Sequence, residues 1–206
     1  MFDPHIVIQA YTQGYFPMAH PDEGNEIFWH LPENRGIIPL DERFKISKNL
    51  EKLYKKGKFE LRQNSDFEAV IWNCSQRRDE TWISEEIIDI YCQLNEMGVA
   101  HSFETWFDGK LVGGLYGLAI GKVFFGESMF SEYPNASKAA LITLAKDAAM
   151  NGMDFIDCQL YTDHLASMGA LNFERGLFIT KLQQTLKKPT LRGNWSDESI
   201  WHRLRL

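Results

Sequence analysis

Apolar residues in alternating or unbroken runs between residues 99 and 131 predict three consecutive β-strands. The predicted strands cover 99–107, 110–120 and 123–131, and the pairs Asp108-Gly109 and Gly121-Lys122 separate them. An Asp-Gly pair between two apolar runs is a strong hairpin signal, because both residues tolerate a positive φ. The middle of the chain is therefore expected to form an antiparallel meander.

Helical signals flank this meander on both sides. Capping residues and glycine stops predict upstream helices at 3–14, 47–57, 65–74 and 84–98. In the third of these, Ser65 and Glu68 would form a capping box. Downstream, the pattern predicts a helix, a strand and a short helix at 136–152, 153–160 and 163–169. Residues 14–40 lack a clear period and are predicted to be an ordered loop region. This α+β order, with a meander followed by a helix and a strand, is found in GCN5-related acyltransferase folds.

The composition is that of one globular domain, with at most a small appendage. The chain has 206 residues, of which 44% are hydrophobic and 24% charged. No run approaches the roughly 18 apolar residues that a membrane span needs, and the N-terminus lacks the features of a signal peptide. Cys74, Cys92 and Cys158 form no C-x-x-C pair, which favours reduced thiols in a cytoplasm.

The net charge of −6 argues against a general nucleic-acid binder, but the charge is unevenly distributed. Residues 43–62 contain eight basic and two acidic side chains, a local charge of +6, and residues 181–206 carry +4. This pattern allows two interpretations: a solvated lysine-rich helix face, or a binding surface for phosphate groups.

Acids, an amide and a histidine gather in DFIDCQLYTDHLASMGA (154–170). A metal site is not favoured, because the six histidines form no H-x-x-x-H pair. Strand alternation would place Asp157 and Gln159 on one face and Cys158 on the other. An acid and an amide near the carboxyl end of a strand can bind a ligand or accept a proton. Equally, Asp157 could cap a turn while Gln159 bonds to edge backbone.

The sequence does not support other common catalytic or nucleotide-binding motifs. GESMFS (126–131) has Phe130 where a nucleophile elbow needs glycine. The chain contains neither G-x-G-x-x-G nor G-x-x-x-x-G-K-[ST]. The segment YPNASKAAL (133–141) lacks the glycine-rich loop with which an acetyl-CoA enzyme of this fold binds pyrophosphate.

Several motifs together resemble the bacterial leucyl/phenylalanyl-tRNA–protein transferases, from about Tyr11 to about Leu186. They are GYFP (14–17), TWI (81–83), LVGGLYG (111–117), GESMFS (126–131), NASK (135–138), IDCQ (156–159) and DHLASMGA (163–170). The resemblance implies that the chain begins well inside the family's usual N-terminal region. The resemblance implies a small N-terminal subdomain at 1–33 and a catalytic domain like GCN5-related N-acetyltransferases (GNAT-like) at 34–206.

The function that the resemblance implies is transfer of Leu or Phe, and weakly Met, from aminoacyl-tRNA. The acceptors would be proteins with N-terminal Arg or Lys, which are thereby marked for N-end rule degradation. Because the ester is already activated, no metal or cofactor is expected. We also expect a cytoplasmic monomer.

The resemblance also implies roles for individual residues. Asp157 and Gln159 would form the catalytic centre, with Asp157 orienting the attacking amine or deprotonating it through Gln159. Glu127 would hold the basic end of the substrate. The side-chain pocket is assigned to Leu115, Phe124 and Gly126, although Phe124 could simply be core, and glycines in this region would leave room for the donor side chain. The family usually has methionine at the Leu115 position. Asp163 and His164 would fix the turn after the strand.

The donor RNA is expected to use aromatic and basic side chains. Trp82, Tyr91 and Tyr11 match positions at the substrate site, the first two near the terminal adenosine. Met18 replaces the family's stacking tryptophan, and either Met18 or Trp29 could serve instead. Contacts to the tRNA backbone are predicted for Lys45, Lys48, Lys52, Lys55 and Lys56.

Two other functions remain compatible with the sequence. One is an aminoacyl-tRNA-dependent transferase with a different acceptor N-terminus or a small-molecule or peptidoglycan acceptor. The other is a tRNA- or peptide-binding module without catalysis, against which the presence of IDCQ and GESMFS speaks.

Overall fold

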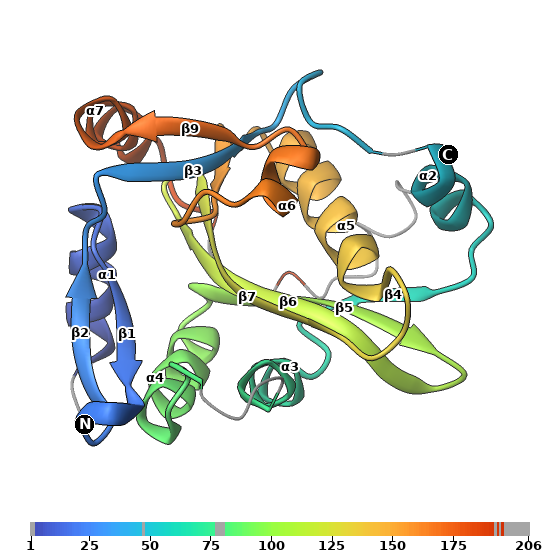
Figure 1. Cartoon of the computed structure of the whole chain (residues 1–206), viewed down its shortest axis with the longest axis horizontal. Helices are drawn as coiled ribbons and strands as arrows, with labels where there is room; N and C mark the ends of the chain where they lie inside the picture. Colours follow the sequence, from blue (N-terminus) through green and yellow to red (C-terminus); the bar gives the residue numbers. More distant parts are fainter. Residues whose placement is uncertain (1–2, 47, 77–80, 192, 194, 196–206) are drawn as a thin grey trace.

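A computed structural model describes residues 3–46, 48–76, 81–191, 193 and 195, and it is built around one mixed β-sheet (Figure 1). The described residues form a seven-stranded sheet in the order β4-β5-β6-β7-β8-β3-β9, together with a separate hairpin, β1-β2. This arrangement of helices and strands is α+β, as predicted.

The predicted meander is confirmed. Its strands are β5 (Ala100–Phe107), β6 (Lys110–Ile120) and β7 (Val123–Ser131), all antiparallel, and β4 (Glu60–Gln63) pairs with the outer edge of β5. Asp108 and Gly109 have φ of 50° and 72°, as a tight hairpin turn between twisted strands requires.

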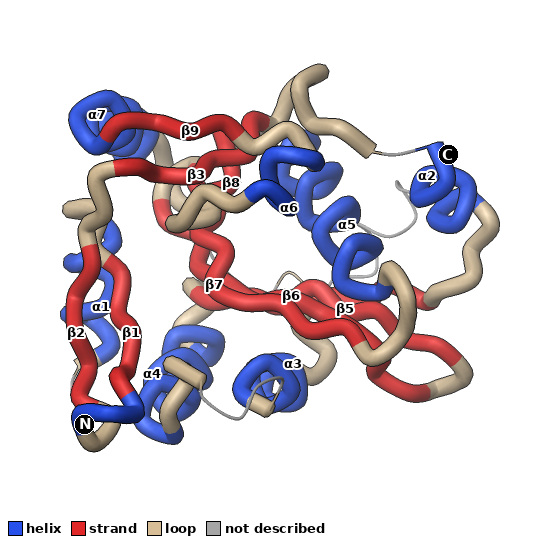
Figure 2. Tube along the Cα trace, in the orientation of Figure 1, coloured by secondary structure: helices blue, strands red, loops and turns tan. Residues whose placement is uncertain are grey.

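Helices cover both faces of the meander (Figure 2). On one face lie α3 (Phe67–Ser75) and α4 (Glu85–Glu96), and on the other lies α5 (Ala136–Met150), with α2 (Lys48–Lys55) beside it. The apolar stripes of α4 and α5 are buried against the sheet, so the two faces have separate cores.

The second part of the sheet is assembled from distant parts of the chain. β8 (Phe155–Asp157) is parallel to β7, and its other edge pairs with β3 (Asn34–Pro39), which in turn pairs with β9 (Leu171–Glu174). The short helix α6 (Asp163–Ser167) follows β8, and α7 (Arg175–Leu186) packs on β3, β7 and β9.

The hairpin and the first helix lie at one end of the molecule (Figure 1). α1 (Pro4–Thr12) begins at the N-cap Asp3, as predicted, and Gly14 follows it with φ of 90°. The strands β1 (Phe16–His20) and β2 (Glu26–His30) are joined through the 3-10 turn η1 (Pro21–Glu23). Among the described residues, no helix is long and apolar enough to cross a membrane.

Three predictions about the elements were wrong. Residues 14–40 form β1, β2 and β3 rather than loop, because cross-strand pairing overrides their weak period. The cap of α3 is Asp66, whose side chain accepts from the backbone N–H of Ala69, while Ser65 bonds to Glu104. The strand predicted at 153–160 is confined to Phe155–Asp157.

Candidate active site

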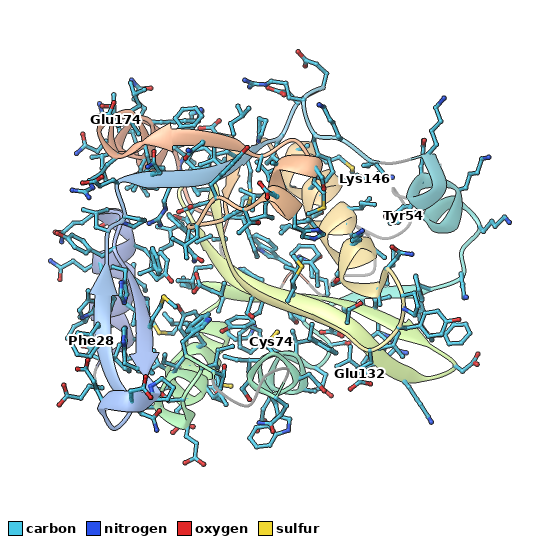
Figure 3. The ribbon with its side chains drawn as sticks, viewed as in Figure 1. Phe28, Tyr54, Cys74, Glu132, Lys146 and Glu174 are labelled. Carbon is cyan, nitrogen blue, oxygen red and sulfur yellow. The ribbon has the colours of Figure 1, made fainter. Side chains whose placement is uncertain are left out.

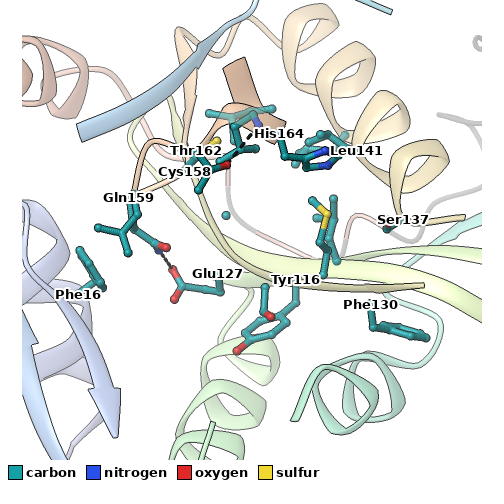
Figure 4. Close-up of a pocket in the computed structure, with 18 of the residues that line it drawn as sticks. Phe16, Tyr116, Glu127, Phe130, Ser137, Leu141, Cys158, Gln159, Thr162 and His164 are labelled. Atoms are coloured by element: carbon teal, nitrogen blue, oxygen red, sulfur yellow. Dashed lines mark hydrogen bonds between the residues drawn. The ribbon is translucent and has the colours of Figure 1, made fainter. Parts of the chain in front are cut away.

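A cavity of about 620 Å³ opens where β7 and β8 separate (Figure 4). Their pairing ends at Phe125 and Asp157, so the rest of β7 diverges from the segment that follows β8. Apolar side chains from β6, β7, α5, β8 and α6 form much of the wall, namely Leu115, Met129, Leu141, Leu144, Ile156 and Leu165. This apolar space suits an uncharged side chain.

Glu127 enters the cavity from a β-bulge. On β6, Tyr116 pairs with Ser128 and Gly117 pairs with Gly126, so Glu127 is the extra residue between two registers. A bulge changes the direction of the strand and of its side chains, and bulges are frequent beside active sites. Here it puts a carboxylate in a nearly closed position, since Glu127 is 9% exposed.

Three neutral donors surround this carboxylate. Tyr11 donates to Glu127 Oε1 at 2.7 Å, Gln159 Nε2 to the same oxygen at 2.8 Å, and Tyr91 to Oε2 at 3.1 Å. Burial raises the pKa of Glu127 to about 7, although the two phenol hydrogen bonds act in the opposite direction. Burial and the Glu127 charge raise the pKa of both tyrosines well above the usual value, so both remain protonated donors.

Gln159 is held in an unusual backbone conformation. Its φ is +57°, its N–H donates to Asp157 Oδ1 at 2.9 Å, and its C=O accepts from the N–H of Gly36 at 3.0 Å. Because an ionised Glu127 can only accept, the Gln159 amide nitrogen faces it. The side-chain oxygen of Gln159 has no hydrogen-bond partner among the described residues and can accept from a bound amine.

Asp157 lies behind the cavity wall and is paired with Arg35. Arg35 Nη2 and Nε donate to its two oxygens at 2.7 and 2.9 Å, and both side chains are at most 1% exposed. The Arg35 guanidinium lies between the rings of Phe16 and Phe178. Asp157 is thus held by β3 and in turn fixes the backbone of Gln159.

The predicted alternation does not continue past Asp157. β8 ends at that residue and Gln159 is left-handed, so Cys158 and Gln159 both line the cavity while Asp157 does not. The turn is also held differently from the prediction: Thr162 caps α6 and His164 lines the cavity.

Only some of the residues predicted for the side-chain pocket line the cavity. Leu115 and Gly126 line the cavity, whereas Phe124 is fully buried in the core, against Phe103. The space expected beside the neighbouring glycines is filled by the protein. An added Cβ would meet Ala136 at Gly113 and Phe125 at Gly117.

Of the residues predicted for the adenosine and elsewhere at the substrate site, only some line the cavity. Met18 and Trp82 both line the cavity, and the Ala19 N–H donates to the Trp82 carbonyl at 3.1 Å, which joins the hairpin to that wall. Tyr91 and Tyr11 instead lie beneath Glu127, where they are fully buried. Trp29 is 36% exposed on β2 and is not part of the cavity wall.

Comparison with known proteins assigns the family. The family model "Leucyl/phenylalanyl-tRNA protein transferase" matches residues 37–183, and the model of its N-terminal domain matches residues 1–33. The chain belongs to the leucyl/phenylalanyl-tRNA protein transferase family. It is an aminoacyltransferase that moves amino acids from aminoacyl-tRNA to proteins.

Individual transferases of this family are closely similar over most of their length. A leucyl/phenylalanyl-tRNA–protein transferase of Legionella pneumophila (strain Corby) is 48% identical over 196 residues, 94% of this chain and 86% of that protein. The one from Zymomonas mobilis is 43% identical over 204 residues, 95% of this chain and 75% of that protein. A solved structure, L-PGS from Bacillus licheniformis, is distant: 14% identity and a TM-score of 0.42, over 92% of this chain and 65% of that one.

Sequence reasoning missed two parts of the transferase site. Arg35 is the second residue of β3, and its only sequence signal is a single cation in front of the run GIIP. Phe16 was noticed only as part of GYFP, yet it lines the cavity and packs on Arg35. Both residues contact partners that are distant in the sequence.

The lysines predicted to contact tRNA are on and beside α2, at the opposite end of the molecule from the hairpin (Figure 1). Lys45, Lys48, Lys52 and Lys56 are exposed, and the side chain of Lys55 lies outside the described residues. In the part of the chain that the structure describes, no group of three His, Cys, Asp or Glu side chains is arranged to hold a metal ion.

Proposed function

We propose that this transferase adds Leu or Phe, and weakly Met, to the α-amine of proteins that begin with Arg or Lys, which marks them for N-end rule degradation. The observation that carries the proposal is the pairing of Glu127 with Gln159 at the edge of an apolar cavity. The apolar part suits the donor side chain, and the buried carboxylate suits a cationic acceptor residue.

The reaction requires little more than placement. The acceptor nitrogen attacks the ester carbonyl, the bond to the ribose oxygen breaks, and the amine proton passes to that oxygen, which leaves as the ribose hydroxyl. An α-amine has a pKa of about 7.7–8.0, so a useful fraction is neutral at pH 7. Holding it at attack distance supplies much of the rate enhancement.

We assign the contact with the amine to Gln159, and we assign to Asp157 the role of orienting Gln159. The free side-chain oxygen of Gln159 accepts an N–H of the attacking amine, while Glu127 fixes the amide from the other side. Asp157 acts through the Gln159 backbone, since it is sealed against Arg35. If positioning dominates, Gln159→Ala should lower the transfer rate only modestly. Equal and near-total losses of transfer for Gln159→Ala and Asp157→Asn would indicate a proton relay instead.

The donor adenosine is placed by the wall that the hairpin and the segment before α4 form. The terminal adenosine stacks on Trp82 and Met18, and base stacking on an aromatic ring contributes roughly 1–3 kcal/mol. Exposed lysines on α2 contact the acceptor stem. We assign residues 1–33 to a small N-terminal subdomain and 34–206 to a GNAT-like catalytic domain, in a cytoplasmic monomer.

The deciding experiment supplies Leu-, Phe- and Met-tRNA together with peptides that begin with Arg, Lys, Asp or Glu. Mass spectrometry then scores addition to each N-terminus. Transfer of Leu and Phe to the Arg and Lys peptides is expected. Transfer to Asp or Glu peptides alone would refute the acceptor class and support a transferase with a different acceptor.

A further inference from the structure

The chain after α7 returns to the meander at the end where β5 begins and β6 turns into β7. The hydroxyl oxygen of Thr190 accepts from the N–H of Gly121, in the turn between β6 and β7, at 2.8 Å. A Cβ at Gly98, just before β5, would lie 2.9 Å from the backbone nitrogen of Gly193, so these two backbones touch directly. This part of the chain therefore crosses the end of the sheet in close contact with it.

Trp195 lies beyond this crossing and is almost entirely buried. Its ring stacks face to face on the imidazole of His101, with centroids 3.7 Å apart and an interplanar angle of 8°. Asn64 orients the imidazole, because its Nδ2 donates to His101 Nδ1 at 2.9 Å while its Oδ1 accepts from the Ser102 N–H at 2.8 Å. Burial lowers the pKa of His101 to about 3, so both stacked rings are neutral throughout the physiological range.

Trp195 also contacts two phenylalanines on the face of the sheet that α5 covers. Its ring centroid is 6.5 Å from those of Phe103 on β5 and Phe124 on β7. These two rings meet edge-on at 5.9 Å. The ring of Phe124 lies against Gly117 on β6, where an added Cβ would be 2.6 Å from Phe124 Cε1. Trp195, Phe103 and Phe124 thus form one aromatic layer on the sheet.

This aromatic layer supports the apolar wall of the cavity. Phe103 is the cross-strand partner of Leu115, and Phe124 precedes Gly126 by two residues on β7, so each lies beside a cavity residue on the same face. Side chains of α5 and of the meander project toward one another on this face (Figure 3). Because protein interiors are close-packed, a change of volume in the layer should shift the wall.

We propose that Trp195 is a positioning residue that limits the size of the donor side-chain pocket, by holding Phe103 and Phe124 in place behind Leu115. The proposal rests on the proposed function, because it takes the side chain of the transferred amino acid to lie in the apolar part of the cavity. Trp195 is not among the described residues that line the cavity, so it acts through the two phenylalanines. A smaller residue at 195 would let their rings move away from the cavity and would leave room for donors larger than Leu.

The test measures donor preference when Leu-, Phe- and Trp-tRNA compete in one reaction with a peptide that begins with Arg. Trp195→Ala should raise transfer of Trp relative to Leu by about 10-fold, the lower end of what one methylene contributes to discrimination in an apolar pocket. Transfer of Phe relative to Leu should rise less. Trp195→Phe, which retains a ring for the stack, should keep the preference of the unmodified protein. Because the donors compete for the same enzyme, these ratios do not depend on how much of a variant is folded.

The matched control is Phe59→Ala, which removes a buried ring elsewhere. Phe59 meets Phe107 and Tyr133 edge-on, and none of the three is among the described residues that line the cavity. This variant should lose stability, but its donor ratios should equal those of the unmodified protein. If Trp195→Ala does not fold, Trp195→Leu leaves a smaller void and should shift the ratios in the same direction by a smaller factor.

A double-variant cycle tests whether Trp195 acts through Phe124. Phe124→Leu should itself change the ratio of Trp to Leu transfer. Trp195→Leu combined with Phe124→Leu should then change the ratio much less than Trp195→Leu does in the otherwise unmodified protein, because the ring that transmits its effect is gone.

Three results would overturn the proposal. They are unchanged donor ratios in both Trp195→Ala and Trp195→Leu, an equal change in the Phe59 variant, and fully additive effects at positions 124 and 195. Failure of the proposed function is distinguishable from all three, because the unmodified protein would then transfer neither Leu nor Phe to the Arg peptide.

Discussion

At the scale of the residue, the site is organised around a carboxylate whose contacting donors are neutral. Glu127 receives hydrogen bonds from two phenols and an amide, and burial raises its pKa to about 7. The nearby charges are Asp157, which raises that pKa, and Arg35, which lowers it. Its charge therefore changes within the physiological range, and acceptor binding should change with it.

The pH profile of Glu127→Gln tests this. As pH rises through about 7, Glu127 ionises and kcat/KM for an Arg peptide should rise. The variant should lose that inflection, keep the one near the amine pKa of about 7.7–8.0, and have a higher KM for the peptide. Initial rates between pH 5.5 and 9 measure both, and an unchanged profile would contradict the role of Glu127.

The same shift has a consequence for stability. A carboxyl group whose pKa is raised by folding favours the protonated folded state, so stability should fall as pH rises from about 4.5 to about 7. Glu127→Gln should reduce this decline in thermal unfolding experiments, while Asp147, whose pKa burial also raises to about 6, still contributes.

Variants of the buried pair Arg35 and Asp157 can distinguish an effect on stability from an effect on catalysis. Arg35→Met leaves an unpaired buried carboxylate and should cost about 3–5 kcal/mol of unfolding free energy. The double variant Arg35→Met/Asp157→Leu removes both charges and should recover most of the melting temperature. Its kcat should stay low, because the Gln159 N–H has lost its acceptor. Recovery of both quantities would make the pair merely structural.

At the scale of the element, the bulge in β7 depends on a glycine in the opposite strand. A Cβ at Gly117 would lie 2.1 Å from the Phe125 carbonyl oxygen, so nothing larger than glycine fits there. The bulge that directs Glu127 into the cavity and Gly117 are therefore parts of one local structure.

Gly117→Ala should be destabilising by about 1–3 kcal/mol, the usual cost of overpacking, and should also lower activity by shifting Glu127. Gly126→Ala is the control, since its nearest contact would be 3.6 Å, an ordinary distance. Thermal melts of both variants measure the difference, and equal melting temperatures would contradict the explanation.

Local signals were enough to predict the elements whose determinants are close in sequence. The caps Asp3 and Ser84 and the Asp108-Gly109 turn fix their own neighbourhoods. β3 could not be found, because its partners β8 and β9 come more than 100 residues later. The cap of α3 was misassigned because Ser65 bonds to Glu104, 39 residues away.

The residues of the candidate site show the same distinction between those that the sequence could predict and those that it could not. Motif matching supplied Glu127, Gln159, Leu115 and Trp82, all of which line the cavity. Strand alternation failed after Asp157, since no periodic rule describes a left-handed residue after a three-residue strand. Arg35 was missed because its role depends on a partner 122 residues away.

At the scale of the whole molecule, a net charge of −6 conceals a basic and an acidic end. The basic segment near α2 should bind phosphates by releasing counterions, so transfer should fall steeply as salt rises. Lys48→Ala/Lys52→Ala should raise KM for aminoacyl-tRNA and reduce the salt slope by about 0.7–0.9 for each lost contact. Lys110→Ala, in the meander turn, is the control. A flat salt response in the unmodified protein would contradict this use of the lysines.

The position of β3 between β8 and β9 has a consequence for synthesis of the chain. Arg35 leaves the ribosome early, but its strand acquires partners only when residues 155–174 have been made. Until then, neither Gln159 nor Asp157 exists, and Arg35 has no carboxylate partner. An interrupted translation product that lacks residue 155 onward contains the strands of the meander but neither Asp157 nor Gln159, so it should have no transfer activity. The order of the strands thus confines activity to chains that are nearly complete.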